Sequence, residues 1–182
     1  MATFNQRNIT EFRSRLAGGG ARANLFEVEI AFPEELGINL TDVSDKVPFL
    51  VKAAEIPASN LGNIPVPYRG RVLPVAGDRT FDPWTVTIIN DTDFVIRDAM
   101  ERWMNGIGAH TQNTGLVSMV DYSADMLVDQ LDKNGNSIKQ YKITGAFPTN
   151  VAAIDLSYET NDAIEEFTVE FQVQYWTSNT TS

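Results

Sequence analysis

The sequence contains no cysteine and a single histidine, and each shortage removes a class of chemistry. Without cysteine there is no disulfide, no thiolate nucleophile and no cysteine-type zinc site. His110 follows a helical pattern in a loop with glycine and asparagine, where a solvated side chain is the ordinary role. There is no Gly-x-Ser-x-Gly elbow, and Gly18-Gly19-Gly20 lacks the strand and lysine of a phosphate-binding loop. We therefore expect no catalytic, cofactor-binding or metal-binding residue and no enzyme activity.

Basic residues are also scarce, with 14 Lys and Arg against 24 Asp and Glu and a net charge of −10. Such a chain is poorly suited to binding nucleic acid through its phosphates, which requires clustered cations. No apolar run approaches the length of a membrane span, and the N-terminus lacks the apolar region of a signal peptide. We expect a cytosolic product without membrane insertion. A chain of 182 residues with 43% hydrophobic residues is large enough for one domain with a core.

Most of the chain shows the alternation or the β-branched composition of strands. In LFEVEIAF, for example, Phe26, Val28, Ile30 and Phe32 alternate with Glu27, Glu29 and Ala31. The predicted strands are residues 25–32, 49–56, 84–90, 119–131, 138–146, 151–158 and 164–176. An Asn134-Gly135 hairpin signal joins two of them. Because helices do not separate the strands, the pattern predicts an antiparallel β-sandwich or partial barrel.

Helical periodicity is clear in one segment, residues 92–107, with Asp91 or Thr92 as the N-terminal cap and Gly106 or Gly108 at the end. A shorter pattern at residues 8–16, with Thr10 as a possible cap, precedes the three glycines. We interpret residues 1–20 as an N-terminal arm with a glycine hinge and residues 21–182 as a single β domain with one flanking helix. Residues 34–47 are expected to be irregular.

Carboxylates gather on one face of three predicted strands, at residues 25–32, 119–131 and 164–174, with hardly any lysine or arginine beside them. Asp121, Asp125 and Asp129 do not predict a metal site, since residues four apart on a strand are separated by ~13 Å. A strand face that carries only negative charge indicates either a surface that repels an anionic molecule or an acidic shell that favours solubility. The residues alone leave both interpretations open.

One basic stretch stands out in this acidic chain, VPYRGRVLPVAGDRTFDPW at residues 66–84. Its prolines at 67, 74 and 83 exclude a central strand but permit an extended edge or ribbon, at about residues 57–83. Its charged residues are Arg69, Arg71, Asp78 and Arg79. They indicate either a solvated loop or a contact with acidic surface on a neighbouring copy.

Three segments, ANLFEVEI, IPVPYRGRVLPVAGDRTFDPWTVTIIND and FPTNVAAIDLSYETNDAIEEFTVEFQVQYW, resemble in order and spacing the tail tube proteins of contractile-tailed bacteriophages. The resemblance covers residues 21–176 and departs in the N-terminal arm, at 34–47 and at 108–116. It implies a β-sandwich or barrel whose hexameric rings stack into a hollow tube. It also places the protein in the virion tail, assembled in the host cytoplasm. The tube would lie inside a contractile sheath and conduct DNA without binding it specifically.

The partners implied by the resemblance are further copies of the chain, the tail sheath protein, and baseplate and tail terminator proteins. Two alternatives are a tube-initiating or baseplate-hub ring, and the tube of a phage-derived or type VI-like injection system. With six copies a ring would carry a charge of about −60. We expect some carboxylates to line the lumen, from the set Glu27, Glu29, Asp121, Asp125, Glu166 and Glu170. The expected inter-subunit contacts are Arg69, Arg71, Asp78 and Arg79.

Overall fold

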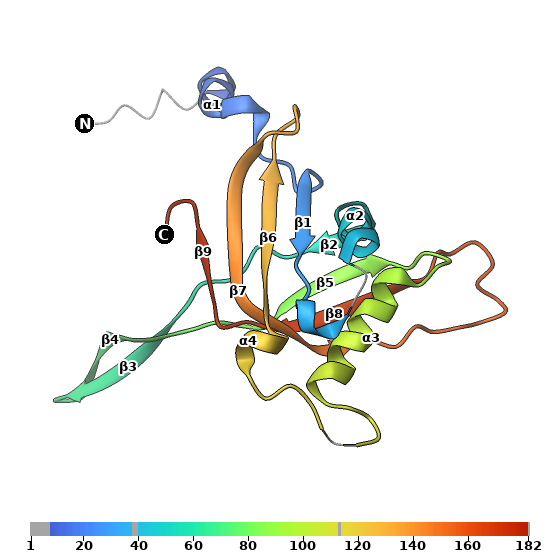
Figure 1. Cartoon of the computed structure of the whole chain (residues 1–182). Coiled ribbons are helices and arrows are strands. Elements are labelled where there is room, and N and C mark those ends of the chain that lie inside the picture. The colour runs from blue at the N-terminus through green and yellow to red at the C-terminus, as the bar shows by residue number, and fades with distance from the viewer. Residues whose placement is uncertain (1–7, 38–39, 113, 182) are drawn as a thin grey trace.

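The computed structural model describes residues 8–37, 40–112 and 114–181 (Figure 1). Residues 1–7 of the expected arm lie outside the described residues. The helices are α1 (Ile9–Arg15), α2 (Leu40–Leu50), α3 (Val95–Ile107) and α4 (Met119–Tyr122), with short 3-10 turns at Ala17–Gly19 and Glu34–Leu36. The strands are β1 (Phe26–Ile30), β2 (Val51–Ala54), β3 (Asn60–Tyr68), β4 (Arg71–Thr80), β5 (Trp84–Ile89), β6 (Ala124–Leu131), β7 (Ser137–Val151), β8 (Glu166–Gln172) and β9 (Tyr175–Ser178).

Seven strands form one antiparallel sheet in the order β1-β6-β7-β8-β5-β2, with β9 pairing on β7. The end strands β1 and β2 lie close to each other, so the sheet curls into an open barrel. This arrangement confirms the predicted mainly β, antiparallel partial barrel. The Asn134-Gly135 turn joins β6 to β7, with Gly135 at φ 83°.

Strand β7 connects the two halves of the curled sheet. Its first half pairs with β6 and β9, and its second half pairs with β8. The change of direction falls at Gly145, whose φ of 65° lies in the left-handed region. A β-carbon there would approach Cδ of Gln174 to 2.7 Å. Only glycine meets both demands without strain, so this residue fixes where the long strand bends.

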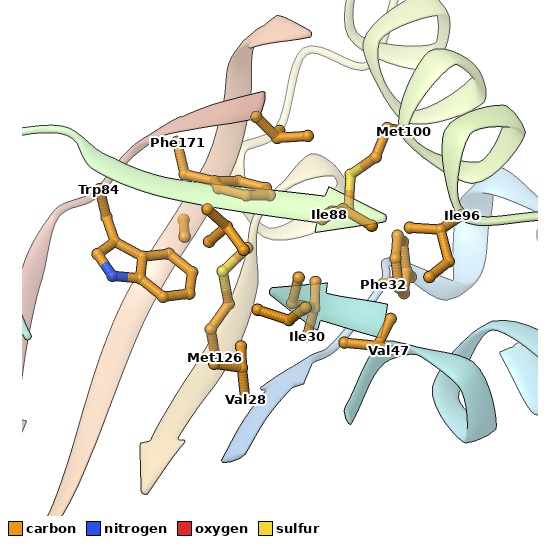
Figure 2. Packing of buried hydrophobic residues seen from close by; sticks show 14 of the residues in the cluster. Val28, Ile30, Phe32, Val47, Trp84, Ile88, Ile96, Met100, Met126 and Phe171 are labelled. Atoms are coloured by element: carbon orange, nitrogen blue, oxygen red, sulfur yellow. The ribbon is translucent and has the colours of Figure 1, made fainter. Parts of the chain in front are cut away.

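The core lies between the concave side of the sheet and two helices (Figure 2). Alternate residues of the strands point into it, as the period of two requires. Helix α3 adds one apolar stripe, in which Trp103 lies 5.3 Å from Phe32 and 6.1 Å from Phe171 between ring centres. The largest fully buried side chains are Trp103, Phe171, Ile88, Met100, Met126, Ile143, Val28, Val47, Val86 and Val169.

The expectation of an irregular segment at residues 34–47 is wrong. It holds a 3-10 turn and most of α2, which packs on β1 and α3. Val43 and Val47, one helical turn apart, are buried in the core. The apolar residues Leu40, Val43, Val47 and Leu50 do lie at helical spacing, but Pro48 inside the last turn weakens the helical signal. More than the one predicted helix therefore flanks the sheet.

Two predicted strands each contain a helix or loop. Residues 119–131 are not one strand, because α4 occupies the first part and β6 starts at Ala124. The Tyr122 carbonyl accepts a hydrogen bond of 2.7 Å from Trp103 Nε1, which ties the end of α4 to α3. Residues 49–56 are a strand only at Val51–Ala54, since α2 extends to Leu50.

The C-terminal strands are also shorter than predicted. Residues 151–158 form a loop beyond Val151, and pairing ends with the hydrogen bond from Ala152 N–H to the Thr168 carbonyl. Leu156 and Tyr158 of this loop lie in solvent, whereas Ile154 is partly buried against the core. Residues 164–176 divide into β8 and β9, because the chain turns at Gln174 and switches to the first half of β7.

The residues that directly precede helices α3 and α1 differ from the predicted N-terminal caps. Helix α3 begins after Phe94, which has a φ of 54° and no side-chain cap, and ends at Gly108 as predicted. Asp91 accepts a hydrogen bond from Lys46 of α2, and a hydrogen bond from the backbone of Val95 at the start of α3 also lowers the pKa of Asp91. Helix α1 is capped by Asn8, whose side chain accepts from Glu11 N–H at 2.8 Å, and not by Thr10.

Candidate assembly surfaces

Strands β3 and β4 form a sheet of their own, a two-stranded ribbon that stands away from the barrel (Figure 1). The register runs from Asn60 opposite Thr80 to Tyr68 opposite Arg71. The tip is a two-residue turn in which Arg69 has a φ of 46° and Gly70 a φ of 82°. Positive φ at both central residues is the hairpin geometry that matches the twist of the strands. The ribbon is therefore a regular hairpin and not an irregular loop.

The ribbon has apolar side chains on both faces. On one face Ile64 lies opposite Val75 and Val66 opposite Leu73, and Leu73 is 61% exposed. The exposed large apolar residues of the ribbon are Leu61, Ile64, Val66, Tyr68, Val72, Leu73 and Val75. A ribbon with this much apolar surface in water has the chemistry of a contact surface, because isolated strands otherwise carry polar side chains on their solvated faces.

The four predicted contact residues fall at opposite ends of the ribbon. Arg69 and Arg71 are at the tip, and the Arg69 guanidinium lies 5.4 Å from the centre of the Tyr68 ring. Asp78 and Arg79 are near the base, where Arg79 Nη1 donates to Ser59 Oγ at 3.0 Å. The span from Arg71 to Arg79 is about 26 Å at ~3.3 Å per residue. The structure thus separates a basic tip from a base that is engaged within its own ribbon.

The carboxylates of β1 lie on the solvent face of the sheet. Glu27 and Glu29 are exposed and alternate with the buried Val28 and Ile30. Glu27 lies directly opposite Asp129 of β6. Asp129 was not among the lumen candidates, and only the strand register shows that it joins this pair. The three carboxylates form an acidic patch that spans two neighbouring strands.

Two of the other candidates are paired with lysines. Lys142 of β7 approaches Asp125 to 2.8 Å, and this hydrogen bond raises the pKa of Lys142. Lys52 approaches Glu166 to 2.6 Å. The acidic strands themselves carry no lysine on these faces, but a neighbouring strand places one beside each of these two carboxylates. The lysines come from strands β7 and β2, so the sequence of the acidic strands alone could not show them.

The remaining two candidates lie elsewhere. Asp121 belongs to α4 and not to a strand, and Glu170 of β8 is half-buried opposite Thr85 of β5. Within one subunit the six candidates do not form one surface, since they divide among the β1–β6 pair, α4 and β8. Glu27, Glu29 and Asp129 are the carboxylates of this patch that have no lysine or arginine partner among the described ion pairs.

The side chains with metal-binding chemistry in this chain are the single histidine and the carboxylates. Among residues 8–37, 40–112 and 114–181, no group of three or more histidine, aspartate or glutamate side chains could hold a metal ion. His110 is exposed, and its backbone N–H donates to the Asn105 side chain. In the same part of the chain, no helix is both long and apolar enough to cross a membrane.

The fold is similar to that of the tube-terminating cap of the anti-feeding prophage, with a TM-score of 0.63 and 15% identity over 89% of this chain and 91% of that one. The curled sheet with its ribbon and flanking helices is thus a tail-tube-type β fold. In sequence the chain is 36% identical to tail tube protein gp19 of Enterobacteria phage T4 over 162 residues, which are 88% of this chain and 93% of that protein. It is 31% identical to the tail tube protein of Serratia phage KSP90, over 94% of each chain.

The phage tail tube protein family matches residues 21–179, and the chain belongs to this family. It is a structural component of a contractile phage tail. The resemblance noted in the sequence is confirmed over nearly the same residues.

Proposed function

We propose that copies of this chain close into hexameric rings and that the rings stack into the hollow tube that conducts DNA inside a contractile sheath. Residues 21–182 form the tube domain in this proposal, and residues 1–20 act as an arm. One observation carries the proposal, namely an exposed apolar ribbon with a basic tip on a strongly acidic body. Such a ribbon is complementary to a second copy of the chain that bears it.

The ribbon supplies attraction of two kinds. Its seven exposed apolar side chains gain free energy when a neighbour covers them, at roughly 25 cal/mol for each Å² removed from water. Arg69 and Arg71 at its tip are attracted by the net charge of −10 on a neighbouring subunit. We infer that the tip contacts carboxylates of the neighbour, and that Asp78 and Arg79 act at the base.

The acidic patch suits the inner wall of the tube. Glu27, Glu29 and Asp129 carry no lysine partner among the described ion pairs. Repeated around a ring, such a patch repels phosphates, so that DNA slides past without adhering. The paired Asp125 and Glu166 contribute less to this field, since each lies beside a lysine. The sheath is then the partner of the outer wall, and terminator and baseplate proteins are the partners at the two ends.

The experiment that tests the proposal is charge reversal at the tip, Arg69→Glu with Arg71→Glu. We expect this variant to remain folded by circular dichroism but to form no tubes by negative-stain microscopy, because like charges then face each other across the contact. The matched control is Arg102→Glu with Lys133→Glu, two exposed cations away from the ribbon that change the net charge equally. Normal tubes from the tip variant, or their loss in the control alone, contradict the proposal.

A further inference from the structure

The direction of the ribbon is fixed at its base, because β3 and β4 pair only with each other. The chain enters from β2 through residues 55–59 and leaves through residues 81–83 into β5. These two short legs hold a hairpin about 30 Å long, at ~3.3 Å per residue. A rotation of about 10° at the base moves the tip by about 5 Å, which exceeds the ~4 Å range of a side-chain contact. Assembly through the tip therefore requires a well-fixed base.

Two indole groups bind the entering leg from different strands. Trp84 of β5 donates from Nε1 to the Glu55 carbonyl at 2.7 Å, and Trp176 of β9 donates from Nε1 to the Ala58 carbonyl at 3.0 Å. Neither carbonyl belongs to a strand ladder, so the indoles satisfy backbone groups that the sheet leaves free. Figure 2 shows the Trp84 ring at the edge of the core with its nitrogen directed away from the packed side chains.

Hydrogen bonds matter here because packing beneath the leg is incomplete. A cavity of about 100 Å³ lies at the ribbon base, lined by residues that include Ile56, Pro57, Pro83, Trp84, Val173 and Trp176. Close packing normally fixes one element on another, and a void removes those contacts on one side. The indole nitrogens bridge from the body to the leg at the border of this void.

The two legs are also tied to each other. Asn60 Nδ2 donates to the Asp82 carboxylate, and Arg79 Nη1 donates to Ser59 Oγ. The base thus behaves as one piece, so a bond that holds the entering leg also holds the leaving leg. Pro57 and Pro83 restrict the backbone torsions of both legs.

We propose that the Trp84 and Trp176 indole N–H groups position the ribbon relative to the barrel. Of the two tryptophans, Trp176 contributes less to the stability of the fold. Trp84 is a core side chain at 2% exposure, so its replacement also weakens the core. Trp176 is half-buried on β9, which pairs with β7 alone, and its ring packs on Tyr141 at 5.8 Å. Both tryptophans act through the ribbon and are positioning residues.

The test compares Trp176→Phe with Trp103→Phe. Each change keeps an aromatic ring and removes one indole hydrogen bond to a backbone carbonyl, but the Trp103 bond joins α3 to the end of α4 and does not contact either leg of the ribbon. Because the chain has no cysteine, Val72→Cys on the ribbon and Asp98→Cys on α3 give two clean attachment points for spin labels. The distance distribution between the labels is measured on full-length, unassembled protein diluted into excess unlabelled protein.

We expect Trp176→Phe to widen this distribution about twofold and Trp103→Phe to leave its width unchanged. Doubling the angular spread divides the correctly oriented fraction by about four, so the critical concentration for tube growth rises about fourfold. Unfolding midpoints are measured in parallel, so that a change in ribbon orientation can be separated from a loss of stability. We expect Trp103→Phe to lower the unfolding midpoint at least as much as Trp176→Phe does. Trp84→Phe is a second variant, with the same widening expected beside a larger loss of stability.

A distribution for Trp176→Phe as narrow as that of the unsubstituted protein overturns the inference. The link to tube growth rests on the proposed function, whereas the width of the distribution does not. If the unsubstituted chain forms no tubes, the proposed function fails while the distance measurement still decides the role of Trp176. If tubes form and Trp176→Phe widens the distribution without changing the critical concentration, ribbon orientation does not control assembly, and the inference is overturned in that part.

Discussion

Replacing Leu73 by alanine separates the stability of the subunit from the stability of the tube. Leu73 lies on β4 opposite Val66 and is 61% exposed, so the folded subunit has little burial to lose there. We expect the free energy of unfolding to change by less than about 0.5 kcal/mol. A chain of this size then shows a shift of the unfolding midpoint of less than ~2 °C.

Tube growth responds differently, because a neighbour covers the exposed part of the same side chain. Full burial of a leucine is worth about 1.5–3 kcal/mol, so the exposed fraction represents about 1–2 kcal/mol per subunit. Since 1.4 kcal/mol is a tenfold change in an equilibrium constant, the critical concentration rises about 5- to 30-fold. Sedimentation of assembled tubes over a series of protein concentrations measures this value.

The control for Leu73→Ala is Met126→Ala, in which the side chain is buried in the barrel at 1% exposure. Its truncation lowers the free energy of unfolding by about 2–5 kcal/mol through lost packing and a cavity. The critical concentration of the protein that remains folded stays unchanged. The reasoning is refuted if Leu73→Ala assembles at the same concentration as the unsubstituted chain, or if it lowers the unfolding midpoint as much as Met126→Ala does.

Three further predictions concern other parts of the molecule. Gly145→Ala should destabilise the fold by about 1–3 kcal/mol, because the left-handed backbone and the crowded β-carbon position both resist a side chain; chemical denaturation measures the loss, and an unchanged midpoint contradicts it. The Lys46 hydrogen bond lowers the pKa of Asp91 below 3.8, so its stabilisation is complete above that pH and is lost as pH falls through the lowered value. Unfolding midpoints in acid should therefore fall less steeply in Asp91→Asn than in the unsubstituted chain, and parallel curves would argue against this. Glu27→Lys with Glu29→Lys should leave tube assembly intact and slow DNA ejection from virions, whereas ejection at the normal rate excludes a lumenal role.

The sequence predicted those elements whose signal is local. Helix α3 has a clear helical period, so its type was evident and only its start moved by a few residues. Strand β8 alternates clearly as well, but the predicted strand 164–176 ran on through a turn into β9. The prolines at 67, 74 and 83 correctly excluded a central strand, and the structure has the β3–β4 ribbon there. The turn between β6 and β7 also has a local signal, since Gly135 adopts a positive φ and the Asp132 side chain accepts from the N–H groups of Asn134 and Asn136.

The elements that were missed depend on distant parts of the chain. Helix α2 contains Pro48 in its last turn and is stabilised by packing on β1 and α3, through residues that include Val43 and Val47. The loop after Val151 has the composition of a strand, but within the described part of the chain no strand pairs with it. Composition alone cannot distinguish these cases, because tertiary packing overrides local propensity.

The candidate surfaces show the same division between local and distant signals. The basic character of the ribbon could be predicted from the sequence, but only the structure places Arg69 and Arg71 at its turn. The acidic faces could not be ranked, since the lysines that pair with Asp125 and Glu166 come from other strands. The tryptophan contacts at the ribbon base join residues 29 and 118 positions apart and became visible only in the folded chain.

Electron cryo-microscopy of the material formed by the purified full-length chain tests the central claim most directly. The account predicts hollow tubes of stacked rings in which each ribbon is covered by another copy, Arg69 and Arg71 lie beside carboxylates of that copy, and Glu27 and Glu29 face the lumen. Tubes in which the ribbon remains in solvent would contradict it, and so would a chain that stays a 20.2 kDa monomer under all conditions of assembly.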